Sequence, residues 1–168
     1  SSGDFYKFRQ LGTIVYDGVV RRVNSEYVDT CFINDKGQLL FNRAGEITDM
    51  ETAQKFVDDN NIRFSLAFGP VLVENGSSVL AMDYENGYIG AQKAAQRTAL
   101  CQLGELHYLV VTVNKEPDNG THGTQSIYTF QKNIQTFVTA MLEADGYKVI
   151  SAHNCGNGKM LFSSLART

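Results

Sequence analysis

The chain has 168 residues, of which 43% are hydrophobic and 20% charged, and its formal net charge is −3. These values are typical of one folded globular domain and exclude an intrinsically disordered chain. Lys and Arg form no basic cluster, so we expect no nucleic-acid partner. No apolar run is long enough for a membrane span, so none is expected.

The three cysteines, Cys31, Cys101 and Cys155, form neither a CxxC pair nor a metal-ligand pattern. Cys31 and Cys101 lie in strand-like runs, where we expect small buried core residues. Cys155 lies in a polar, glycine-rich stretch where a reactive thiol is plausible. Neither a metal site nor a cofactor is evident in the sequence.

The first third of the chain has the pattern of antiparallel strands. In "GTIVYDGVVRRV", two β-rich runs flank Asp17-Gly18, which predicts a tight hairpin. A second strand pair is predicted at Tyr27 to Ile33 and Gln38 to Phe41, around a turn at Asn34 to Gly37.

A short helix is predicted next. Thr48 and Glu51 have the spacing of a capping box, which marks the start of a helix. The apolar side of this helix would consist of Met50, Ala53, Phe56 and Val57.

The middle of the chain contains two further apolar runs and then two clear strands, separated by a long loop. The segment "RFSLAFGPVLVENG" contains two apolar runs split by Gly69-Pro70, and "RTALCQL" and "LHYLVVTV" are joined by a tight turn at Gly104-Glu105. The loop runs from Ser77 to Gln96, and long loops in compact domains are often functional. A second long polar loop runs from Asn114 to Thr124.

The last third predicts a long helix at Thr124 to Asp145, because its apolar residues recur at helical spacing. The strand "YKVISA" should follow and lead into a loop at His153 to Lys159, within "SAHNCGNGKMLF". We therefore predict an α+β (mixed α/β) domain, with a mainly antiparallel or mixed sheet and one long and one short helix packed on it.

Several of these segments, in the same order along the chain, resemble the phosphodiester glycosidase family, which is related to the N-acetylglucosamine-1-phosphodiester uncovering enzyme. The similar segments are "SSGDFYKFRQLGTIVYDGVV", "FSLAFGPVLVENG", "QRTALCQLGELHYLVVTVNK" and "TQSIYTFQKNIQTFVTAMLEADGYKVISAHNCGNGKMLF". Relatives in this family occur in exopolysaccharide proteins and phage tails.

The resemblance implies one domain over residues 1–168, lacking N- and C-terminal parts of the full family domain. It implies a glycan or sugar-phosphate ligand, and it leaves open that other chains of an assembly complete the domain. It favours an extracellular, cell-surface or virion location, although the sequence itself does not give one.

The resemblance also implies site residues from separate segments that converge on one cleft. A guanidinium suits a phosphate, but Arg97 could also be a surface residue at the start of a strand. Asp4 could instead cap a turn, and Lys115 could be a solvated loop charge. The glycines could form an anion-binding nest or only a tight turn. The implied catalytic residues are Asp4, Arg97, His153 and Asn154, and the implied substrate-binding residues are Tyr6, Thr98, Lys115, Gly156, Asn157 and Gly158.

The sequence departs from the family pattern where chemistry is expected. Gln96 replaces a Pro, Lys115 replaces an Arg, Asn154 replaces an Asp, and Gly158-Lys159 replace two Ser. Asn cannot ionise, so it cannot act as a general base or nucleophile. Two hypotheses follow: a hydrolase of sugar phosphodiesters, or a non-catalytic structural or glycan-binding module.

Overall fold

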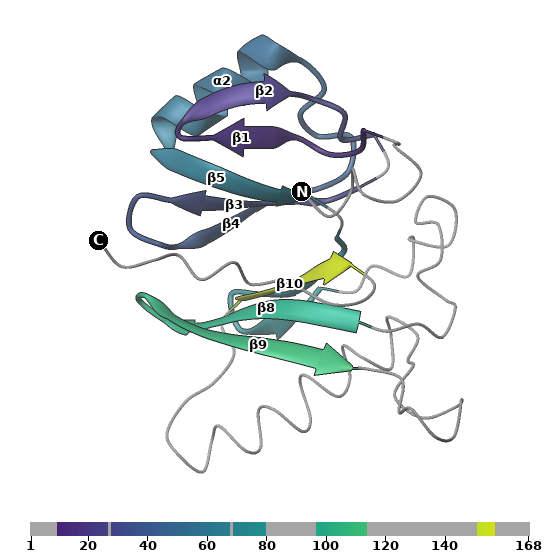
Figure 1. Ribbon diagram of the computed structural model, residues 1–168, viewed down its shortest axis with the longest axis vertical. Helices are drawn as coiled ribbons and strands as arrows, with labels where there is room; N and C mark the ends of the chain where they lie inside the picture. The colour runs from purple at the N-terminus through teal and green to yellow at the C-terminus, as the bar shows by residue number, and fades with distance from the viewer. Residues whose placement is uncertain (1–9, 27, 68, 80–96, 114–150, 157–168) are drawn as a thin grey trace.

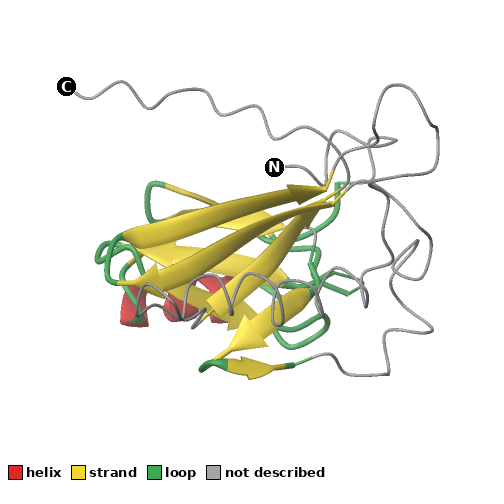
Figure 2. Ribbon diagram, turned by 90° about the horizontal axis from the view of Figure 1, so that it is seen from below, coloured by secondary structure: helices red, strands yellow, loops and turns green. Residues whose placement is uncertain are grey.

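The fold is described by a computed structural model that covers residues 10–26, 28–67, 69–79, 97–113 and 151–156. In this part, the strands form two five-stranded antiparallel sheets, and one short helix accompanies them (Figure 1). Figure 2 shows how strands dominate the described chain. The prediction of an α+β domain was therefore wrong, because the described part of the structure is mostly β. The predicted helix at Thr124 to Asp145 lies outside the described residues.

The first sheet, called sheet A here, has the strand order β2-β1-β5-β3-β4. Two of its hairpins confirm the sequence predictions. Asp17 and Gly18 connect β1 and β2 with φ values of 51° and 77°, as a tight hairpin turn requires. The strands are β1 (Ile14–Tyr16), β2 (Val19–Arg22), β3 (Thr30–Asn34), β4 (Leu39–Asn42) and β5 (Ile62–Ala67).

Helix α2 (Met50–Asp59) confirms the short helix, but its N-cap is Asp49 rather than the predicted Thr48. The Asp49 carboxylate accepts a hydrogen bond from the backbone N–H of Thr52 at 2.8 Å, and this bond lowers the pKa of Asp49. Asp49 caps the helix because its carboxylate accepts a hydrogen bond from a backbone N–H of the first turn, which has no acceptor within the helix.

Helix α2 packs on sheet A, on the side away from the second sheet (Figure 1). Of the predicted apolar side, Ala53 and Val57 are buried, whereas Met50 is 48% exposed. The rings of Phe32 and Phe56 lie 5.1 Å apart between centroids, in a tilted arrangement. The buried residues of this core are Val15, Val20, Phe32, Ile47, Ala53, Val57 and Ile62.

One side chain of α2 also contacts the edge of sheet A. The Gln54 amide accepts a hydrogen bond from Val20 N at 3.0 Å and donates one to Gly18 O at 3.0 Å. Strand β2 is the last strand on its side of the sheet. Gln54 therefore bonds to backbone groups that no other strand of the described residues reaches.

The second sheet, called sheet B, has the order β7-β6-β10-β8-β9. The predicted strands around Gly69-Pro70 and the pair of β8 and β9 are confirmed. Gly104 pairs with His107, so the turn between β8 and β9 consists of Glu105 and Leu106, one residue later than predicted. The strands are β6 (Val71–Glu74), β7 (Ser77–Ser78), β8 (Arg97–Gly104), β9 (His107–Val113) and β10 (Ser151–Gly156).

Strand β10 differs most from the prediction. We expected a strand ending at Ala152 and a loop from His153, but the strand continues to Gly156. It pairs with β6 on one side and with β8 on the other, and this central position overrides the low strand propensity of Asn and Gly. Cys31 and Cys101 are buried with no exposed surface, as predicted for small core residues.

Candidate functional site

The candidate site lies at the end of sheet B where β8 begins and β10 ends. In the antiparallel register, Asn154 lies opposite Ala99 and Gly156 lies opposite Thr98. Arg97 is two residues from Ala99, so sheet geometry places its Cα on the order of 8 Å from that of Asn154. Two segments far apart in the sequence are thus adjacent here.

The pairing of β8 and β10 contains an irregularity at this point. The register shifts between Asn154 and Gly156, so Cys155 is the additional residue of a bulge. Bulges bend a strand and re-aim its side chains, and they are over-represented next to active sites. The backbone of β10 therefore departs from regular pairing beside Thr98.

Arg97 and Thr98 are buried, each with 1% of its surface exposed. The alternative reading of Arg97 as a solvated arginine at a strand start is therefore excluded. A buried guanidinium must be matched by acceptors or charge, because its desolvation is costly, and Arg97 does have interaction partners within the protein.

The start of β6 lies at the same end of sheet B, since Val71 pairs with His153. It follows the cis peptide Gly69-Pro70. The backbone N–H of Val71 donates a hydrogen bond of 2.9 Å to the carboxylate of Asp29, which is buried. Asp29 immediately precedes β3 of sheet A, so this contact joins the two sheets.

Sequence reasoning missed Asp29. The signal that could have found it is a carboxylate within the apolar run "YVDTCFI", because a buried Asp is rare unless it is paired. Its second oxygen accepts a hydrogen bond from Ala44 N at 3.0 Å, and Arg43 Nη1 lies 3.5 Å from the first. Arg43 also forms an ion pair of 2.7 Å with Glu74, at the far end of β6.

The chain before β1 reaches the corresponding end of sheet A. Gly12 N donates a hydrogen bond of 2.6 Å to Asn24 O, and a Cβ on Gly12 would clash with Ala67 at the end of β5. Gly12 thus lies against Ala67, which precedes the turn that leads into β6.

Five of the predicted site residues lie outside the described part of the chain, and three others are described only by their backbone. For the latter three, on β10, the register above gives the position. Those outside are Asp4, Tyr6, Lys115, Asn157 and Gly158, and those described by backbone are His153, Asn154 and Gly156.

The sequence matches the phosphodiester glycosidase family over residues 1–142. This match covers most of the chain. The protein belongs to the phosphodiester glycosidase family. The matched region contains β8 with Arg97 and Thr98, but ends before β10. No curated protein matches the chain.

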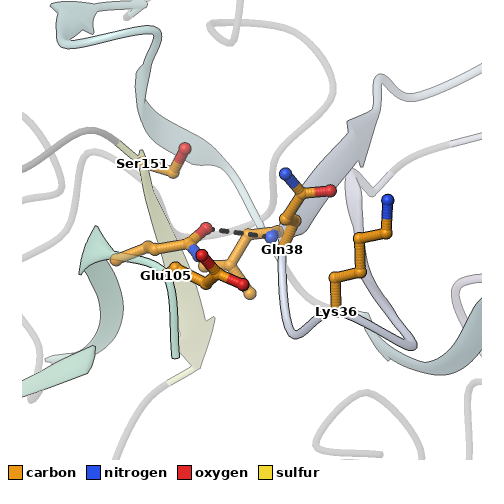
Figure 3. A pocket seen from close by; sticks show the side chains of 6 residues that line it. Lys36, Gln38, Glu105 and Ser151 are labelled. Carbon is orange, nitrogen blue, oxygen red and sulfur yellow. Dashed lines mark hydrogen bonds between the residues drawn. The ribbon is translucent and has the colours of Figure 1, made fainter. Parts of the chain in front are cut away.

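A polar groove of about 510 Å³ lies elsewhere on this phosphodiester glycosidase domain, at the opposite end of β3 and β8. Figure 3 shows Lys36 and Gln38 on one side of it and Glu105 and Ser151 on the other. Its floor includes Gln102, whose amide accepts a hydrogen bond from Leu39 N at 3.0 Å. The groove is thus formed where the β3–β4 turn docks on sheet B.

Tyr108 also contributes to this docking. Its hydroxyl donates a hydrogen bond to the carbonyl of Gly37, in the β3–β4 turn. Burial raises the pKa of Tyr108, and the electrostatic effect of Cys31 raises it further. The phenol is therefore held in its neutral, hydrogen-bonding form.

The described residues include no group of three or more His, Cys, Asp or Glu side chains suited to hold a metal ion. Among the same residues, no helix has the length and apolar character needed to cross a membrane.

Proposed function

We propose that this domain binds a glycan that carries a sugar-phosphate diester, at the end of sheet B where β8 begins and β10 ends. The observation that carries the proposal is the pairing of Thr98 with Gly156, which brings Arg97 beside β10. Membership of the phosphodiester glycosidase family supports the ligand class. A guanidinium suits two phosphate oxygens at once. Because Arg97 is 1% exposed and has partners within the protein, binding requires it to exchange one of those contacts for the ligand.

We further propose that hydrolysis by this chain is weak. Cleavage of a sugar-phosphate bond needs a proton donor or a base near the glycosidic centre. Asn154 lies opposite Ala99, two residues along β8 from Arg97. The family resemblance implies an Asp at this position. The Asn amide can neither give up nor take a proton at neutral pH. The domain would then bind the sugar-phosphate diester but cleave it only slowly.

The experiment uses the full chain and a sugar 1-phosphate esterified with p-nitrophenol. Binding is measured by calorimetry, and hydrolysis by chromatographic separation of the free sugar from nitrophenyl phosphate. We expect Arg97→Lys to weaken binding about tenfold through loss of the two-pronged contact. We expect Asn154→Asp to raise the rate about a hundredfold, the usual contribution of one acid or base.

The matched control is Arg21→Ala, which removes an exposed arginine on β2 and should leave both measurements unchanged. Absence of binding by the wild-type chain would favour a purely structural module and end the proposal. Fast wild-type hydrolysis would instead overturn the claim of weak catalysis.

A further inference from the structure

We infer that Asp29 is a positioning residue that, together with Arg43, sets the placement of β6 and, through it, of β10. The consequence for ligand binding rests on the proposed function, but the structural claim does not. Asp29 immediately precedes β3 of sheet A, whereas β6 and β10 belong to sheet B.

The first step is the environment of the Asp29 carboxylate. Its side chain is 1% exposed, and its two oxygens accept hydrogen bonds from the backbone N–H groups of Ala44 and Val71. A carboxylate suits this place because it only accepts hydrogen bonds. An amide would turn an NH₂ group toward one of the two donors and leave it unpaired.

The second step is the turn that precedes β6. Gly69 has a φ of +65°, and a Cβ built on it would lie 2.9 Å from the Cβ of Asp29 and 3.1 Å from its N. The backbone at Gly69 therefore packs directly on Asp29, at a distance that only glycine allows. The close packing of Gly69 on Asp29 and the hydrogen bond from Val71 N to Asp29 together fix the start of β6.

The third step is that β6 is held at its two ends. Val71 N bonds to Asp29 at the start, and the carboxylate of Glu74 pairs with Arg43 at the end. Arg43 Nη1 also lies 3.5 Å from the carboxylate of Asp29. The side chains of Asp29, Arg43 and Glu74 therefore form one charged network that contacts both ends of β6. Because Val71 pairs with His153 and Val73 with Ala152, a shift of β6 would carry β10 with it.

The test is amide hydrogen exchange of the full chain, for the wild type and for Asp29→Asn. We expect exchange in β6 and β10 to become about tenfold faster, since one charge-assisted hydrogen bond is worth at least that factor. Exchange in the β1–β2 hairpin should not change. Asp17→Asn is the matched control, because it removes an exposed carboxylate of sheet A that pairs with Arg63.

A milder variant covers the case in which Asp29→Asn does not fold. Glu74→Gln removes a charge from a side chain that is 37% exposed, and we expect exchange in β6 and β10 to rise about threefold, as for a partly exposed ion pair. Uniform acceleration across both sheets, or none, would overturn the inference.

Affinity for the nitrophenyl sugar-phosphate probe gives a second measurement on the same variants. We expect Asp29→Asn to bind it about tenfold more weakly. Unchanged affinity would overturn the consequence for ligand binding, while the exchange pattern decides the placement of β6 and β10. If the wild-type chain binds no probe, the proposed function fails, while the exchange pattern still decides the inference.

Discussion

At the residue scale, two glycines distinguish two reasons why a side chain would destabilise the fold. One reason is an unfavourable backbone conformation, and the other is steric overlap with neighbouring atoms. Gly69 and Gly45 both have positive φ, at +65° and +82°. A Cβ on Gly45 would meet nothing within 4 Å, whereas one on Gly69 would meet Asp29 at 2.9 Å. The pair is therefore a matched comparison within one protein.

We expect Gly45→Ala to lower the free energy of unfolding by about 1 kcal/mol, the cost of a left-handed residue with a side chain. Gly69→Ala should lower it by about 3 kcal/mol, because overpacking adds to that cost. Urea denaturation of both variants measures the difference. Equal losses would contradict the close packing of Gly69 on Asp29.

At the scale of elements, the sequence predicted the structures that depend on local residues, such as hairpin turns. It missed the structures that depend on neighbouring strands. Asp17-Gly18 specifies the β1–β2 turn by itself, so that hairpin was found. Strand β10 continues through Asn154 because β6 and β8 flank it, and no local signal reports those neighbours. The pairing of Thr98 with Gly156 likewise exists only in the folded sheet, and the buried Asp29 has partners from two other segments.

Gln102 shows how two hairpins dock through one side chain. It is 4% exposed, and its amide bonds to Leu39 N at 3.0 Å, to Gly37 O at 3.3 Å and to Gly104 O at 3.2 Å. It therefore satisfies backbone groups of the β3–β4 turn that sheet pairing leaves free.

We expect Gln102→Ala to lower the free energy of unfolding by about 1–3 kcal/mol, because the buried backbone N–H of Leu39 loses its bond to this amide. The control is Gln38→Ala, which removes an exposed amide bonded only to the Asn34 side chain among the bonds described here and should cost less than about 0.5 kcal/mol. Chemical denaturation provides both values. Similar small losses would show that water replaces the Gln102 contacts.

At the scale of the whole molecule, the two sheets are joined by polar contacts at both ends of β3. Asp29 contacts β6 at one end, and Gln102 and Tyr108 contact the β3–β4 turn at the other. The predicted α+β architecture failed at this scale, because periodicity in the sequence does not report how sheets pair with each other.

Tyr108 is expected to make the free energy of unfolding decrease as the pH becomes alkaline. Its pKa is raised in the fold, so the unfolded chain loses this proton first, as the pH rises past about 10. The stabilisation is complete below that pH and is lost as the pH approaches the raised pKa. We expect the free energy of unfolding of Tyr108→Phe to fall less steeply above pH 10 than that of the wild type.

Denaturation at several pH values between neutral and alkaline measures this slope. Tyr16→Phe, which removes the hydroxyl of a side chain that is 63% exposed, controls for the loss of a phenol. Parallel curves for the wild type and Tyr108→Phe would contradict the expectation.

The contact of Gln54 with strand β2 has a consequence for encounters between copies of the protein. An edge strand with free backbone groups is a template on which a second chain can add its own strand, and such addition leads to aggregation. Here the Gln54 amide engages Val20 N and Gly18 O from the helix side. Docking of α2 on sheet A thus also occupies two backbone groups at this edge, which disfavours the addition of a strand from a second copy at that point.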